Sequence, residues 1–100
     1  MAATKLSDDE VQQHMTHLPG WSRQGDSITR QYQFADFDHA LEFVIAVGRA
    51  AEDVKHHPDM DIRYNKVTLT LTTHDAGGLT EADMEMAASA DGAADALGAS

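Results

Sequence analysis

The apolar residues near the start of the chain recur with the spacing of a helix. The run Ser7-Asp8-Asp9-Glu10 has the form of a capping box, and Pro19-Gly20 would stop a helix that begins there. Val11, Met15 and Leu18 then fall on one face. We therefore expect a first helix between the capping box and Pro19.

Apolar and polar residues alternate along further stretches, and this is the period of a β-strand. The expected strands are 21–23, 27–34, 61–64 and 66–73. Turns are expected at 24–26 and near Asn65-Lys66. In the last strand Val67, Leu69 and Leu71 face one way and threonines face the other. One apolar and one polar face predict an antiparallel sheet that helices cover on one side only.

Two further helices are expected. The second runs from Asp36 to about His56, because Pro58 disfavours helical backbone just before it. Its predicted buried stripe consists of Phe37, Ala40, Leu41, Val44, Val47, Ala51 and Val54. The last begins at a capping box, Thr80-Glu81-Ala82-Asp83, and its Ala- and Gly-rich end over 91–100 should fray. The order α-β-β-α-β-β-α predicts an α+β fold in a single domain of residues 1–100.

Composition narrows the class of protein. The 100 residues are 42% hydrophobic, include no cysteine, and contain no apolar run near the ~20 residues that span a bilayer. We therefore expect a soluble, cytoplasmic protein. Twelve aspartates, three lysines and a net charge of −10 argue against direct binding of nucleic acid. The charge fits either an ordinary acidic protein or a halophilic one, in which salt screens the repulsion between surface carboxylates.

Half of the six histidines fall within 19 residues, at His56, His57 and His74. Histidine exchanges protons near neutral pH, so these residues are candidates for acid–base catalysis. Glu52 lies four residues before His56 and so on the same helical face, where it could orient that ring. Two alternatives stay open. The histidines could bind a metal, although adjacent ones rarely aim both rings at one ion, or they could simply lie at a helix end.

Asp83 and Trp21 also allow two interpretations. Asp83 could support catalysis or only complete the capping box that begins at Thr80. Trp21 could lie beside a ligand or in the core.

The spacing of these residues resembles the signature of the pterin-4a-carbinolamine dehydratases. Glu52, three spacers and His56-His57-Pro58 are followed by Tyr64, His74 and Asp83, a pattern of 32 residues. Outside this pattern, Gly20-Trp21 and 34–40 also resemble the family, and so the resemblance covers roughly residues 18 to 90.

The resemblance implies a four-stranded antiparallel sheet with three helices on one face. It implies a lyase that dehydrates a 4a-hydroxy-tetrahydropterin, as in the recycling of the tetrahydrobiopterin cofactor of aromatic amino-acid hydroxylases. His56, His57 and His74 would be catalytic, with Glu52 and Asp83 in support. The implied substrate-binding residues are Trp21, Lys55, His56, His57, Thr72, Thr73, His74 and Asp75. No metal or cofactor is implied, since the pterin is the substrate.

The resemblance also implies a homo-oligomer, either a dimer or a tetramer. The acidic, alanine-rich last helix differs from the more apolar one through which animal members assemble, and this leaves the tetramer open. Two other functions stay open as well. One is a pterin-binding protein of molybdopterin metabolism, and the other is a non-enzymatic dimerisation cofactor for a transcription factor. The run Asp59-Met60-Asp61 lacks an aromatic residue that some members have there.

Overall fold

A computed structural model of the chain describes residues 4–100, so residues 1–3 of the predicted domain lie outside it. Its elements alternate as the sequence predicts, α-β-β-α-β-β-α, with one short 3-10 helix, η1, added before the last helix. In chain order they are α1 (Asp8–Met15), β1 (Ser22–Gln24), β2 (Ser27–Gln33), α2 (Phe37–Val54), β3 (Asp59–Arg63), β4 (Lys66–Leu71), η1 (His74–Ala76) and α3 (Glu81–Ala96).

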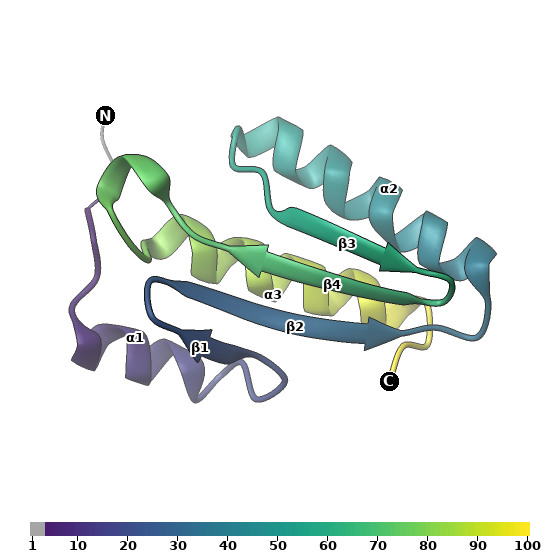
Figure 1. The fold of residues 1–100 in the computed structure, drawn as a ribbon, viewed down its shortest axis with the longest axis horizontal. Helices are drawn as coiled ribbons and strands as arrows, with labels where there is room; N and C mark the ends of the chain where they lie inside the picture. The colour runs from purple at the N-terminus through teal and green to yellow at the C-terminus, as the bar shows by residue number, and fades with distance from the viewer. Residues whose placement is uncertain (1–3) are drawn as a thin grey trace.

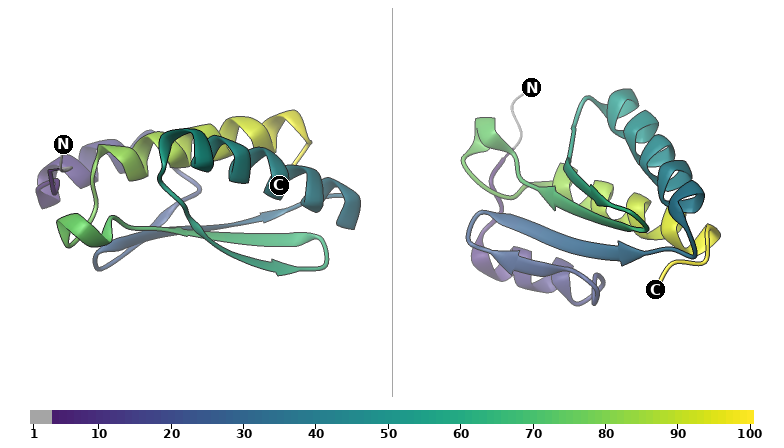
Figure 2. Two further views of the ribbon diagram at one scale, coloured as in Figure 1. Left: turned by 90° about the horizontal axis from the view of Figure 1, so that it is seen from above. Right: turned by 45° about the vertical axis from the view of Figure 1, so that its right-hand side comes forward.

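The four strands form one antiparallel sheet in the order β1-β2-β4-β3 (Figure 1). All three long helices lie on the same face of the sheet, and the other face is open (Figure 2). This arrangement confirms the predicted fold. None of the helices within residues 4–100 is long and apolar enough to cross a membrane.

The core lies between the sheet and the helices. On β4, Val67, Leu69 and Leu71 are buried, as their alternation with threonines predicts. Tyr32 of β2 and Phe43 of α2 are fully buried, and their ring centroids are 4.7 Å apart. The helix-facing side of the sheet thus carries the apolar residues, as expected for an antiparallel sheet with one solvated face.

The predicted buried stripe of α2 is partly wrong. The buried residues of this helix are Ala40, Phe43, Val47 and Ala51, and Phe43 was not among those predicted. Phe37, Leu41 and Val54 are exposed to 44%, 37% and 64%. The helix carries apolar residues on more than one face, and the periodicity of the sequence does not show which face contacts the sheet.

The ends of several other elements also differ from the prediction: β1 is shifted by one residue, β2 ends at Gln33 instead of 34, and β4 ends at Leu71 instead of 73. β3 begins at Asp59 rather than at 61, and its turn to β4 uses Tyr64, whose φ is 51°. The predicted fraying over 91–100 is not seen. The helix α3 continues to Ala96, and Ala94 is buried. Ser100 then exchanges two backbone hydrogen bonds with Gln33, at 2.9 and 3.2 Å.

Candidate active site

A hollow of about 340 Å³ lies where the chain leaves α2 and where β4 ends. The residues that line it come from these two segments and from the start of β3. They are Lys55, His56, His57, Asp59, Thr72, Thr73, His74 and Asp75. The structure therefore brings the three predicted histidines to one hollow, together with four of the other predicted substrate-binding residues. A second hollow of about 340 Å³ shares Thr72 and His74 with the first.

The end of α2 separates the two adjacent histidines. The helix stops at Val54 because Lys55 has left-handed backbone, with φ 55°. The N–H of Lys55 donates to the carbonyl of Glu52, and the N–H of His56 donates to that of Ala51, at 3.0 Å. This is the Schellman pattern of a helix end. His56 consequently lies outside the helix, and the predicted contact between its ring and Glu52 does not form.

His56 instead pairs with Asp83, at the start of α3. Its Nε2 lies 2.5 Å from Asp83 Oδ1. The Asp83 side chain is completely buried and that of His56 is 15% exposed. The second carboxylate oxygen, Oδ2, accepts hydrogen bonds from the Thr80 backbone N–H at 2.9 Å and the Thr73 hydroxyl at 2.8 Å. Asp83 thus caps α3, which is one of the two interpretations that the sequence allowed. It also forms a hydrogen bond with the ring of His56.

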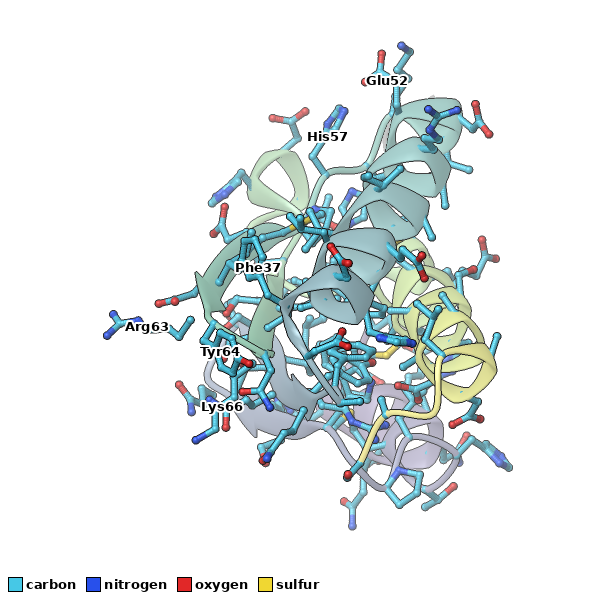
Figure 3. The ribbon with its side chains drawn as sticks, turned by 90° about the vertical axis from the view of Figure 1, so that its right-hand side faces the viewer. Phe37, Glu52, His57, Arg63, Tyr64 and Lys66 are labelled. Carbon is cyan, nitrogen blue, oxygen red and sulfur yellow. The ribbon has the colours of Figure 1, made fainter. Side chains whose placement is uncertain are left out.

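His57 takes the partner that the sequence suggested for His56. Its Nε2 lies 2.8 Å from Glu52 Oε1, and Lys55 Nζ donates to Glu52 Oε2 at 2.6 Å. Glu52 and His57 lie near each other at the same end of the molecule (Figure 3). The Lys55 ammonium, and to a smaller extent the His57 ring, lower the pKa of Glu52. All three side chains are exposed, so this network stabilises the fold little.

The other predicted residues that line the hollow, Thr72, Thr73, His74 and Asp75, follow the end of β4. His74 begins η1 and is exposed. The Thr72 hydroxyl donates to the backbone carbonyl of Asp26 at 2.6 Å. The backbone N–H of Thr73 donates to the Gly78 carbonyl at 3.0 Å. With the N–H groups of Lys55 and His56, four donor groups of the predicted substrate-binding residues are therefore engaged within the protein.

Trp21 does not line the hollow, and its predicted role in substrate binding is not supported. Its side chain is 5% exposed in the core, and its Nε1 donates to Asp91 Oδ1 at 3.0 Å. Tyr32 contacts Trp21 edge-on, with centroids 6.3 Å apart. The alternative interpretation, a core tryptophan, agrees with this position.

Two residues of the site were not predicted from the sequence. Asp59 lines the hollow, and its position directly after His56-His57-Pro58 was the available signal. The Thr80 hydroxyl lies 2.8 Å from that of Thr73, which no local pattern indicates.

The side chains around the hollow include several groups that can accept or donate a proton. Two imidazoles have carboxylate partners in opposite environments, one pair buried and one exposed, and a third imidazole faces the same hollow. Within the described part of the chain, no three or more carboxylate, imidazole or thiol groups are gathered so as to hold a metal ion.

Comparison with known proteins gives consistent matches. The family model described as pterin 4 alpha carbinolamine dehydratase matches residues 4–93. A protein of Roseiflexus sp. strain RS-1 is 51% identical over 89 residues, which are 89% of this chain and 96% of that protein. A protein of Thermomicrobium roseum is 48% identical over 83 residues, covering 83% of this chain and 89% of that protein. Both carry pterin-4-alpha-carbinolamine dehydratase as a provisional name.

Two solved structures have the same fold. A transcriptional coactivator/pterin dehydratase from Brucella melitensis superposes with a TM-score of 0.89 at 34% identity, covering 91% of this chain and 99% of that one. A pterin dehydratase-like protein, identified as a RuBisCO assembly factor of the alpha-carboxysome, superposes with a TM-score of 0.62. At 21% identity, over 74% of this chain and 86% of that one, the second likeness is one of fold alone.

Proposed function

The chain belongs to the pterin 4 alpha carbinolamine dehydratase family, and from that premise we propose that it removes water from a 4a-hydroxy-tetrahydropterin by histidine acid–base catalysis. The product is the quinonoid dihydropterin. The observation that carries this proposal is the single hollow lined by His56, His57 and His74. The pterin is the substrate, so the proposal requires no cofactor.

The reaction needs one proton to be given and one to be taken. The bond from C4a to the hydroxyl oxygen breaks, and an acid protonates the departing hydroxyl so that it leaves as water. A base removes the proton from the adjacent ring nitrogen, whose electron pair forms the new double bond to C4a. An imidazole can serve either step because its ordinary pKa of about 6.5 lies close to neutral pH. Each correctly placed group contributes roughly 10²–10⁴-fold to the rate.

The two carboxylate pairs suit different tasks. His56 is held by a fully buried carboxylate, which fixes its ring in one orientation. His57 is 59% exposed and pairs with an exposed carboxylate, so its ring can reorient when a ligand enters. His74 lines the same hollow from another segment, at the start of η1. A pterin in the hollow would therefore have imidazoles from two segments beside it.

The direct test is dehydration of a synthetic 4a-hydroxy-tetrahydropterin. We expect His57→Ala or His74→Ala to lower kcat/KM by about 10²-fold. His17→Ala is the matched control, since this exposed histidine lies outside the hollow. EDTA should have no effect. Full activity in a double variant of His57 and His74, or a loss with EDTA that zinc restores, would contradict the proposal.

We also propose that the protein forms a homo-oligomer through one apolar surface. Phe37, Leu41 and Ile45 recur every four residues along α2 and are 37–54% exposed. Ile62 and Tyr64, in and just after β3, are 42% and 68% exposed. Figure 3 shows Phe37 pointing from α2 toward the side of β3. An exposed apolar cluster of this kind is typical of a protein–protein interface.

Sedimentation of the wild type and of two α2 variants tests this second proposal. The wild type should sediment as a multiple of its 10.8 kDa chain, and Ile45→Glu should shift it toward the monomer. Ala46→Glu, at an exposed position of α2 about 100° around the helix from Ile45, is the control and should leave the mass unchanged. A monomeric wild type would refute the proposal.

A further inference from the structure

We propose that Thr73 is a positioning residue that holds Asp83 and thereby sets the protonated nitrogen of His56. The effect of Thr73 on catalysis rests on the proposed function, whereas its effect on the His56 ring is a property of the free protein.

Asp83 accepts three hydrogen bonds from three separate segments. Oδ1 faces His56 Nε2 at 2.5 Å, and Oδ2 receives the Thr80 backbone N–H and the Thr73 hydroxyl. The carboxylate is fully buried, and no buried side-chain polar atom within residues 4–100 lacks a partner. The backbone N–H of Thr80 can only donate, and an ionised carboxylate can only accept hydrogen bonds.

The direction of each hydrogen bond then follows. Because Asp83 accepts, His56 must carry a proton on Nε2 and donate it. In the neutral ring the other nitrogen, Nδ1, then has the free electron pair. Nδ1 has no hydrogen-bond partner among the described residues. His56 therefore exchanges its catalytic proton through Nδ1.

Thr73 has one hydroxyl proton, and it goes to Asp83 at 2.8 Å. The contact with the Thr80 hydroxyl at 2.8 Å must then run the other way, with Thr80 donating to Thr73. The two hydroxyls thus form a chain that ends on the carboxylate. Thr80 is 1% exposed, so a water molecule cannot readily replace its hydroxyl as the donor to Thr73.

The backbone of Thr73 is fixed as well. It forms a bridge with Gly78, with N–H to carbonyl distances of 3.0 and 3.3 Å. The next residue is His74, which lines the hollow. One residue therefore ties the segment that carries His74 to the carboxylate that orients His56. The family resemblance implied that Thr73 binds the substrate, and its hydroxyl could not donate to a ligand while it donates to Asp83.

The test combines ring ¹⁵N spectra of histidine with steady-state kinetics on three variants. Thr73→Val keeps the shape of the side chain and removes the hydroxyl, and Thr73→Ser restores a hydroxyl. Thr68→Val, on the open face of β4, is the control for the same change outside the site.

We expect wild-type His56 to show a protonated Nε2 and an unprotonated Nδ1 in its neutral form. In Thr73→Val the His56 ring should become a mixture of forms protonated on Nε2 and on Nδ1. The kcat should fall about tenfold with little change in KM. Thr73→Ser should restore both, and Thr68→Val should match the wild type.

Several outcomes would overturn the inference. A wild-type His56 protonated on Nδ1 refutes it at once, as does an unchanged ring pattern in Thr73→Val. Failure of Thr73→Ser to restore the pattern would show that Thr73 acts through packing instead. If Thr73→Val does not fold, the wild-type and Thr73→Ser spectra still decide. A protein with the expected ring patterns but no dehydratase activity would refute the proposed function and leave the positioning role intact.

Discussion

Replacing Asp91 with alanine should destabilise the fold strongly, although this residue does not line the hollow. Asp91 Oδ1 accepts hydrogen bonds from Trp21 Nε1 at 3.0 Å, Arg30 at 2.8 Å and the Tyr32 hydroxyl at 2.5 Å. Burial, and then the hydrogen bond to Asp91, raise the pKa of Tyr32, so its phenol remains a donor. One carboxylate oxygen therefore satisfies polar groups of the core that have no other partner among the described residues.

The magnitude follows from the donors that lose their acceptor. Trp21 and Tyr32 are 5% and 0% exposed, and each buried donor left unpaired costs about 1–3 kcal/mol. Because Asp91 itself is 22% exposed, water can reach part of this cluster. We therefore expect a loss of about 3 kcal/mol, in the lower half of the range of about 2–6 kcal/mol for two donors. For a chain of this size that corresponds to a fall in Tm of about 12–24 °C.

Urea unfolding followed by the emission of Trp21, the one tryptophan of the chain, measures this loss. With a slope of about 1.5 kcal/mol/M, the midpoint should fall by about 2 M. Asp91→Asn keeps an acceptor oxygen at the same place and should lose less. Asp95→Ala, an exposed aspartate on the same helix, controls for the change in helix propensity. A loss below about 1 kcal/mol in Asp91→Ala, or an equal loss in Asp95→Ala, would refute the reasoning.

Three further predictions concern exposed parts of the protein. The hydrogen bond to Asp36 raises the pKa of His39. This pair should therefore stabilise the fold fully below about pH 6.5 and lose its contribution as the pH rises through the raised pKa. NMR titration should show that pKa returning toward its ordinary value in Asp36→Asn, which keeps the helix cap; an unchanged pKa would contradict this. Because Lys55 has left-handed backbone, Lys55→Gly should be more stable than Lys55→Ala by about 1 kcal/mol in thermal melts, and the reverse order would count against the strain. Finally, a net charge of −10 predicts that the Tm rises by several degrees between ~0.1 M and ~1 M KCl, as the Debye length falls from ~10 to ~3 Å, and a flat or falling series would exclude a salt adaptation.

Much of the fold could be predicted from the sequence because its signals are local. The capping box at Ser7 forms, with Glu10 Oε1 2.8 Å from the Ser7 backbone nitrogen. The alternation of Val67, Leu69 and Leu71 with threonines shows which side of β4 is buried. A cap or a two-residue period depends on neighbours within a few positions, and the sequence displays those directly.

The extent of the buried surface of α2 was less predictable. Phe37, Leu41 and Ile45 have the same apolar character as Phe43 and yet remain exposed. Which stripe is covered depends on how the helix lies against the sheet and α3. That is a property of packing between elements, and an amphipathic period does not contain it.

The sequence by itself indicated that the three histidines could meet, since His56 and His57 follow the end of a helix and His74 follows a strand. The tertiary structure alone decided their partners. The left-handed Lys55 turns His56 away from Glu52, four residues before it, and toward Asp83, 27 residues after it. In the same way Trp21 finds its acceptor 70 residues away, in the core instead of the site. A hydrogen bond depends on the position of two atoms within a few tenths of an ångström, and for residues so far apart only the packed helices and sheet set that position.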